Sequence, residues 1–204
     1  GASFWSIDKE QLLVDAAGGR IAQRFHYLQP MLWASASAQG ETQRRTFGDA
    51  SMQVGGAEVL DRLGFAAAPD RIAREAIELL EAPNCPEGRM DVVLAPDQMV
   101  LQIHESIGHP LELDRILGDE RNYAGTSFVT PDMFGTYRYG SHLLNVTFDP
   151  GIGEEIASYA YDDEGTPATR EYLIKDGVLM RPLGGATSQA RANLPGVANE
   201  RACS

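Results

Sequence analysis

Two histidines and a glutamate fall within one six-residue window of the chain, His104-Glu105-Ser106-Ile107-Gly108-His109. Neutral imidazole is a common nitrogen ligand of zinc, and a carboxylate beside the first histidine can accept a proton from a metal-activated water. The better-known zinc signature has its histidines four residues apart, on one face of a helix. Here the separation is five. The window predicts a hydrolytic metal site, with two unrelated histidines as the alternative.

The five-residue separation requires an irregular helix. A regular α-helix turns by about 100° per residue and would point His104 and His109 about 140° apart, too far for one ion. Gly108 tolerates unusual φ values, and Pro110 disfavours the α conformation at His109, so the helix could end at Gly108. A single wide π turn would serve equally well. Either irregularity allows both imidazoles to reach one ion.

Two other groups of residues invite a metal interpretation. A third ligand could come from elsewhere in the chain, although each candidate has a structural or solvated role as its alternative. These candidates are Cys85, His142, Glu112 and Asp114. The carboxylates of Asp162, Asp163 and Glu164 could attract a hard cation, but Asp-Asp-Glu-Gly before a strand is more typical of a turn with solvated charges.

The remaining histidine and an aromatic group have simpler interpretations. His26 lies between Phe25 and Tyr27 in an apolar strand, where a packed or exposed histidine is the default. Five aromatic residues follow the histidine window and could either line a peptide cleft or pack in the core. They are Tyr123, Phe128, Phe134, Tyr137 and Tyr139.

The residues before and after the histidine window predict the secondary structure that surrounds it. Met90–Ala95 has the composition of a buried strand, and Pro96-Asp97 begins a helix. The apolar residues of that helix have the spacing of a core-facing stripe: Met99, Val100, Ile103 and Ile107. The long polar segment Pro110–Gly140 has no clear periodicity, which is uncommon unless a segment lines or covers a site.

The rest of the second half predicts strands. Leu143–Phe148 and Glu155–Tyr161 have strand composition. A hairpin is expected at Glu171–Ile174 and Val178–Met180, because Asp176-Gly177 supplies the positive φ values of a type I′ turn.

The first half predicts a β-meander followed by a helix. Arg20–Gln29, Met31–Ala38 and Thr42–Phe47 are the expected strands, with a turn at residues 39–41. Pro69-Asp70 then begins a helix in which Asp70 could cap the first amides. Its apolar face comprises Ile72, Ala76, Ile77, Leu79 and Leu80. The run 82–88 is rich in helix breakers and is the best candidate linker.

These elements predict an α+β fold with antiparallel sheets, a few helices and two parts. Helices are too few for parallel crossovers. We expect an N-terminal α+β portion at 1–84 and a second α+β portion at 85–204 that carries the histidine window. The chain opens without an initiator methionine and closes on Ala202-Cys203-Ser204, so we expect the second portion to be truncated at its C-terminus.

Composition excludes several classes of function. The 204 residues carry 17 Lys+Arg against 29 Asp+Glu, a formal net charge of −12. Nucleic-acid and anionic-membrane surfaces need clustered positive charge, so neither partner is expected. Apolar stretches are too short to cross a bilayer. The only cysteines, Cys85 and Cys203, are far apart in sequence, which fits a reducing compartment. We expect a cytoplasmic protein.

Several segments together resemble the TldD/PmbA family of zinc metallopeptidases, also described as modulators of DNA gyrase. The resemblance covers most of the chain and is strongest from Cys85 onward. It rests on Cys85–Gly88, Met90–Pro96, His104–Glu112, Tyr123–Phe128 and Asp162–Pro167, followed by Arg170 and the 173–179 hairpin. Within the family the HExxxH window is typical of TldD-like members, and their PmbA-like (TldE) partners generally lack it.

The resemblance implies a peptidase for unfolded or flexible peptides. It implies that His104 and His109 bind zinc, that Glu105 is the general base, and that two homologous subunits pair as a homo- or heterodimer. It also implies a third ligand, a cysteine in a C-terminal region beyond Ser204. The alternative is a non-catalytic scaffold or regulatory protein that binds a protein partner without a complete metal site.

Overall fold

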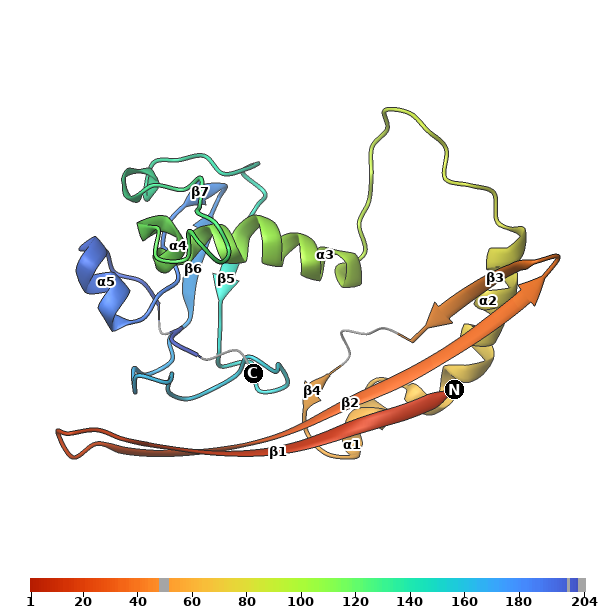
Figure 1. Cartoon of the computed structure of the whole chain (residues 1–204), viewed down its shortest axis with the longest axis horizontal. Helices are drawn as coiled ribbons and strands as arrows, with labels where there is room; N and C mark the ends of the chain where they lie inside the picture. Colours follow the sequence, from red (N-terminus) through yellow and green to blue (C-terminus); the bar gives the residue numbers. More distant parts are fainter. Residues whose placement is uncertain (48–51, 198, 202–204) are drawn as a thin grey trace. The chain divides into compact units, whose positions relative to one another are not determined.

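The computed structural model describes residues 1–47, 52–197 and 199–201, so Cys203 lies outside the described residues. The chain divides into two compact units (Figure 1). Unit 1 comprises residues 1–10, 24–97 and 154–156, and unit 2 comprises residues 11–23, 98–153 and 157–204. Both units contain antiparallel strands and helices, which confirms the α+β prediction. A boundary between residues 84 and 85 stays a prediction.

A long β-hairpin begins the chain. Strand β1 (Ala2–Val14) pairs with β2 (Arg20–Ala38), which also pairs with β3 (Glu41–Thr46) and β4 (Gln53–Val54). The two strands predicted within residues 20–38 are therefore one continuous strand, and β1 was not predicted. The turn at residues 39–41 is confirmed, with positive φ at Gln39 and Gly40.

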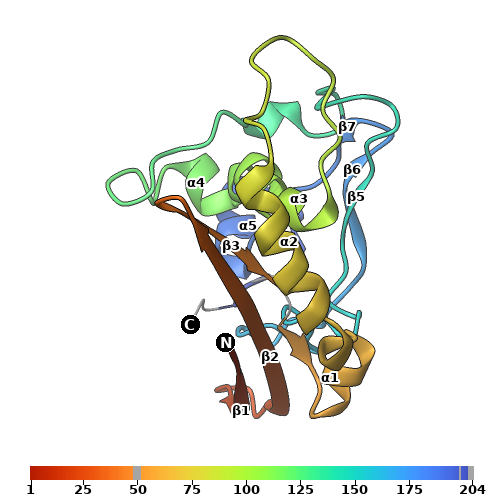
Figure 2. The ribbon, with the colours of Figure 1, turned by 90° about the vertical axis from the view of Figure 1, so that its right-hand side faces the viewer.

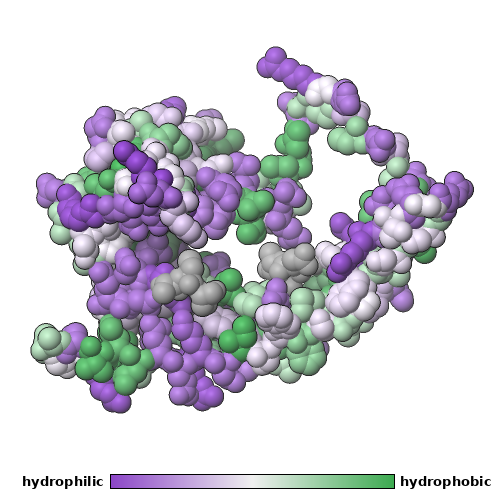
Figure 3. All heavy atoms as spheres, in the orientation of Figure 1, coloured by the Kyte–Doolittle hydropathy of each residue, from purple (hydrophilic) through white to green (hydrophobic). Residues whose placement is uncertain are grey.

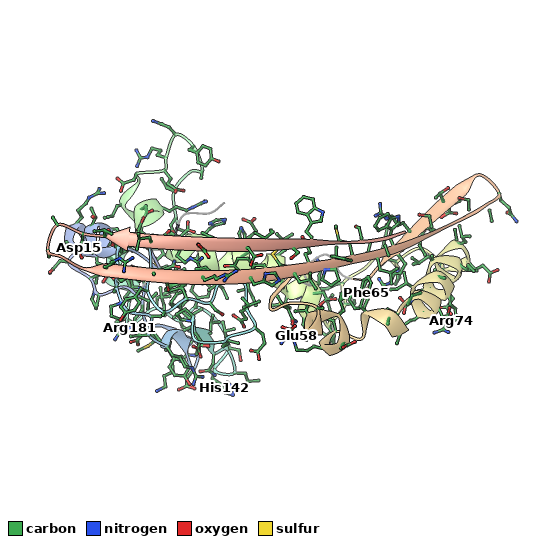
Figure 4. The ribbon with its side chains drawn as sticks, turned by 90° about the horizontal axis from the view of Figure 1, so that it is seen from below. Asp15, Glu58, Phe65, Arg74, His142 and Arg181 are labelled. Carbon is green, nitrogen blue, oxygen red and sulfur yellow. The ribbon has the colours of Figure 1, made fainter. Side chains whose placement is uncertain are left out.

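Helices cover part of this sheet. Helix α1 (Glu58–Arg62) was not predicted, whereas α2 (Pro69–Glu81) is the expected helix. Figure 4 shows both helices, marked by Glu58 and Arg74, along the strands. Only part of the predicted face of α2 is buried: Ile72 packs on Leu32, but Ile77 is exposed. The N-cap position is occupied by Ala68, so the prediction that Asp70 caps the helix is wrong.

The segment between α2 and the next helix contradicts the sequence prediction. Residues 82–95 form no helix or strand, so the prediction of a buried strand at Met90–Ala95 is wrong. The side chains of Val92 and Val93 are 70% and 99% exposed, and Figure 3 shows apolar residues uncovered along this segment. A strand needs partners for its backbone amides and carbonyls. No strand among the described residues pairs with this segment.

The core of unit 2 lies on a three-stranded antiparallel sheet. Its strands are β5 (Val146–Phe148), β6 (Glu171–Lys175) and β7 (Val178–Leu179), seen side by side in Figure 2. The β6–β7 hairpin confirms the prediction, since Asp176 and Gly177 have φ values of 49° and 78°. Strand β5 is shorter than the predicted Leu143–Phe148.

Helix α3 (Pro96–Ile103) leads into the histidine window. The predicted core-facing stripe on this helix is wrong, because Val100 and Ile103 are exposed and only Ile107, beyond its end, is buried. Two short helices were not predicted: α4 (Leu113–Leu117) and α5 (Ala186–Ala192). The rest of Pro110–Gly140 is mostly irregular, as expected.

The strand predicted at Glu155–Tyr161 is also wrong. The backbone turns back on itself there, because the amide of Tyr159 donates to the carbonyl of Pro150 over 3.1 Å and the hydroxyl of Ser158 donates to the carbonyl of Ile152. Residues 153–157 form turns and a bend, and no residue from 155 to 160 belongs to a strand. Tyr161 makes only an isolated bridge, to Pro167.

The helices of the described residues were compared with the length and apolarity that a bilayer-spanning helix needs. Across residues 1–47, 52–197 and 199–201, none is both long and apolar enough to cross a bilayer.

Candidate metal centre

The histidine window forms a π-helical turn directly after α3. The turn spans His104–Gly108, and the amide of His109 donates to the carbonyl of His104, five residues earlier. This bond widens the helix and places the His104 and His109 rings edge to face, with centroids 4.2 Å apart. The structure thus confirms that the helix is irregular here, in the π form.

The alternative prediction, that an unusual φ at Gly108 and a non-helical His109 bring the two imidazoles together, is wrong. Gly108 has an ordinary φ of −55°, and His109 is in the α region with φ −56° and ψ −41°. A following proline disfavours the α region for steric reasons but does not forbid it, and Pro110 itself occupies the first turn of a 3-10 segment, His109–Leu111, where a missing amide is tolerated.

Buried side chains anchor the turn. Ile107 and Leu111 are in the core of unit 2 together with Ile174 and Leu179 from the β6–β7 hairpin. The side chains that precede these anchors in the turn face outward: His104 is 55% exposed and Glu105 is 62% exposed. The turn is therefore fixed by the core while its polar groups remain accessible.

Tyr139 compensates for a hydrogen bond that the turn cannot make. In an α-helix the carbonyl of Ser106 would accept from the amide of residue 110, but Pro110 has none. The hydroxyl of Tyr139 donates to this carbonyl instead. The phenol is protonated at neutral pH, and burial raises the pKa of Tyr139 further above its ordinary value of 10.0. This contact crosses 33 residues of sequence and was not predicted.

The three polar residues of the window form a group that could hold a metal ion. One ligand atom each from His104, Glu105 and His109 lies within 4.8 Å of the others. Ligands of a single zinc ion, at about 2.1 Å each, lie no more than about 4.2 Å apart. Small side-chain rotations would therefore suffice. Two imidazoles and a carboxylate are also chemically suited to zinc.

The other candidate ligands do not join this group. Glu112, Asp114 and His142 belong to the same unit, yet the group found among the described residues contains none of them. His142 is exposed near the edge of unit 2 (Figure 4). Cys85 is a free, exposed thiol in unit 1.

The acidic run is a turn, as expected. Asp162 accepts from the amides of Glu164 and Thr166 over 3.0 and 2.8 Å. Its side chain is buried, however, so the expectation of solvated charges is wrong for this residue. Burial and the charge of Glu164 raise the pKa of the neighbouring Glu200.

The aromatic residues do not form one surface. Phe134 and Tyr139 pack against the core of unit 2, whereas Tyr123 is almost fully exposed. Phe128 and Tyr137 each contact the ring of Tyr139, with centroids about 6 Å apart. Part of the group therefore has the core-packing role that the sequence left open.

Two converging imidazoles and a carboxylate in an α+β unit define a candidate metal-binding protein, and comparison with known sequences identifies the family. The sequence model of the PmbA/TldA metallopeptidase C-terminal domain matches residues 87–204. The chain belongs to this family, which confirms the resemblance inferred from its motifs.

Curated relatives have consistent names. A metalloprotease of Methanocaldococcus jannaschii is 32% identical over 154 residues, which cover 72% of this chain and 32% of the relative. A zinc metalloprotease TldD homolog of Saccharolobus solfataricus is 26% identical over 132 residues, covering 64% of this chain and 28% of the relative. The chain spans about a third of the length of these relatives.

Solved structures share the fold. A protein named as a modulator of DNA gyrase from Thermotoga maritima aligns with a TM-score of 0.72 at 16% identity, covering 98% of this chain and 43% of that one. TldE from Thermococcus kodakarensis aligns with a TM-score of 0.61 at 13% identity, covering 94% and 40%. At these identities the similarity concerns the fold alone.

Proposed function

We propose that the protein is a zinc-dependent peptidase that hydrolyses unfolded or flexible peptides, with Glu105 as its general base. The observation that carries this proposal is the convergence of His104 and His109 on one side of a π turn, with Glu105 between them in sequence. The metalloprotease names of several relatives add independent support.

The residues present have the chemistry that this activity needs. A zinc ion held by the imidazoles of His104 and His109 would supply a Lewis acid that lowers the pKa of water and polarises a peptide carbonyl. Glu105 would accept the proton of the attacking water and then donate it to the departing amine. Its exposed carboxylate can reach a substrate without rearrangement of the core.

A complete site needs one more ligand. Catalytic zinc sites typically use three protein ligands, and the described residues bring together two imidazoles. We propose that the third ligand is a cysteine from a more C-terminal part of the protein, as the family resemblance implies. A TldD/TldE-type pairing of two homologous subunits, in the cytoplasm, is part of the same proposal.

The decisive experiment uses the protein in its full natural length. Glu105→Gln is expected to lower kcat on a flexible peptide substrate about 10²–10⁴-fold while zinc content stays near one equivalent. Glu120→Gln, which removes a partly exposed carboxylate outside the histidine window, is the matched control. Undiminished activity of Glu105→Gln would refute the proposed mechanism. A wild-type protein that binds no zinc would instead support the non-catalytic scaffold.

A further inference from the structure

One side chain outside the candidate ligand group is bonded directly to it. The Oε1 atom of Glu112 lies 2.9 Å from Nδ1 of His109, and its Oε2 atom accepts from Nε of Arg115 over 2.8 Å. The three residues are spaced at intervals of three, so they follow one another along the turn into α4. One carboxylate oxygen of Glu112 thus contacts the imidazole of His109, and the other accepts from the guanidinium of Arg115.

The carboxylate of Glu112 is held in place from both ends. Arg115 is only 17% exposed, and it also donates to the carbonyl of Ala124 over 3.1 Å and pairs with Glu120 at 3.2 Å. The backbone on either side of Glu112 is bonded to Leu183, through the carbonyl of Leu111 at 2.8 Å and the amide of Leu113 at 2.9 Å. Hydrogen bonds therefore hold both the main chain around Glu112 and its side chain.

This contact selects one form of the imidazole. A carboxylate oxygen can only accept a hydrogen bond, so Nδ1 of His109 must carry the hydrogen. In the neutral ring the lone pair is then on Nε2. Histidines that ligate metals commonly donate their second ring N–H to a carboxylate, which fixes the tautomer and orientation of the ring.

We infer that Glu112 is a positioning residue that holds His109 as the Nδ1–H tautomer and so presents Nε2 as the metal ligand. The inference rests on the proposed function, since it assigns a role toward the same metal. It also corrects the interpretation of Glu112 as a candidate third ligand. Both of its oxygens are engaged by protein groups, and the ligand group found among the described residues excludes it.

The test compares three variants of the full-length protein. Glu112→Leu removes the acceptor, Glu112→Gln keeps an acceptor oxygen without the charge, and Glu120→Gln is the matched control. Glu120 pairs with the same Arg115 but makes no contact with His109 that the structure records. The first measurement is the tautomer of His109 in the metal-free protein, from ring-nitrogen NMR shifts assigned with His109→Gln. The second is zinc affinity by chelator competition.

We expect His109 to carry its hydrogen on Nδ1 in the wild type and in Glu120→Gln, and to lose this preference in Glu112→Leu. Zinc affinity should fall about 10–100-fold in Glu112→Leu, less in Glu112→Gln, and not at all in the control. A purely structural role for Glu112 would leave the tautomer unchanged.

Two results would overturn the inference: an unchanged His109 tautomer in Glu112→Leu, or wild-type zinc affinity in that variant. If Glu112→Leu does not fold, the zinc affinity of Glu112→Gln is the deciding measurement. An affinity equal to that of Glu120→Gln would also overturn the inference. Failure of the wild type itself to bind zinc refutes the proposed function and the inference together, and is thereby distinguished from failure of the inference alone.

Discussion

Two regions of the molecule pair a histidine with a carboxylate through Nδ1, and they differ in what surrounds the pair. In unit 2, His109 and Glu112 are 2.9 Å apart within one helical turn. In unit 1, His26 and Asp8 are 2.7 Å apart across the β1–β2 hairpin. Beyond the carboxylate, His109 has a second imidazole, that of His104, as its neighbour. His26 has instead the hydroxyl of Ser6, 3.5 Å from its Nε2.

The hairpin pair shows that a histidine–carboxylate contact is not in itself a site. Ser6, His26 and Asp8 follow the order of a nucleophile, base and orienting acid. The hydroxyl of Ser6, however, is 3.5 Å from Nε2 of His26, at the long limit of a hydrogen bond. The charge of Arg24, 3.8 Å from Asp8, further engages the carboxylate. The π turn differs because it adds a second ligand of the same kind.

The largest expected effect tests this difference directly. His104→Ala and His109→Ala should each weaken zinc binding by more than about 100-fold, beyond the range seen for changes outside the ligand set. His26→Ala should retain the wild-type zinc content. The measurement is metal content by inductively coupled plasma mass spectrometry after dialysis against a weak chelator.

Either of two results would contradict this difference between the π turn and the hairpin pair. Loss of zinc from His26→Ala would mean that the hairpin pair contributes to binding. Retention of zinc by both His104→Ala and His109→Ala would mean that the ion is bound somewhere other than the π turn.

The second effect concerns stability. Leu111 is fully buried beneath the turn, between His109 and Glu112, so Leu111→Ala should destabilise the protein by about 2–5 kcal/mol. Leu12, on the exposed hairpin, is the matched control, and Leu12→Ala should change stability by no more than about 0.5 kcal/mol. Urea unfolding followed by circular dichroism measures both. Equal losses would show that the hairpin is as tightly packed as the π turn.

Short sequence patterns predicted the helices and hairpins whose stability depends on residues close together in the sequence. The helix at Pro69–Glu81 was visible from its first proline and apolar periodicity, and the hairpin at Glu171–Leu179 from Asp176-Gly177. The strands expected at Met90–Ala95 and Glu155–Tyr161 failed because strand composition indicates only that a segment could pair. Whether it does depends on a neighbour elsewhere in the chain.

The contacts of the candidate site also divide into those that neighbouring residues predict and those that depend on distant parts of the chain. The ligand window and the need for an irregular helix followed from six adjacent residues, and the π turn meets that need. The Glu112 contact could have been found from its spacing of three from His109. The bond from Tyr139 to Ser106 could not, because it joins residues far apart in sequence through the packing of unit 2.

A smaller effect tests why the turn widens. Gly108 has φ −55°, and an added Cβ would meet only the carbonyl of Ile103, at 3.8 Å. Gly108→Ala should therefore keep zinc binding and change stability by no more than about 1 kcal/mol. At Gly177, with φ +78°, a Cβ would collide with the carbonyls of Ser141 and Gly140, and Gly177→Ala should cost more than about 1 kcal/mol. Loss of zinc from Gly108→Ala at unchanged stability would show that the turn needs glycine.

The smallest effect returns to the hairpin pair. The hydrogen bond from His26 is the main cause that lowers the pKa of Asp8 below its ordinary value of 3.8. A lowered pKa in the folded state means that the stabilisation is fully present above the unfolded value and is lost as the pH falls through the folded value. Asp8→Asn should thus reduce stability slightly at neutral pH, and the deficit should vanish in strong acid.

Urea unfolding of the wild type and Asp8→Asn at several pH values measures this deficit, once without metal and once with zinc at neutral pH. Zinc should leave the deficit unchanged, because the pair on β1 and β2 belongs to no ligand group among the described residues. A deficit that is independent of pH would show that Asp8 acts by packing and not by charge. A deficit that grows with zinc would place Asp8 and His26 in contact with the ion, and the two histidine–carboxylate pairs would then have the same function.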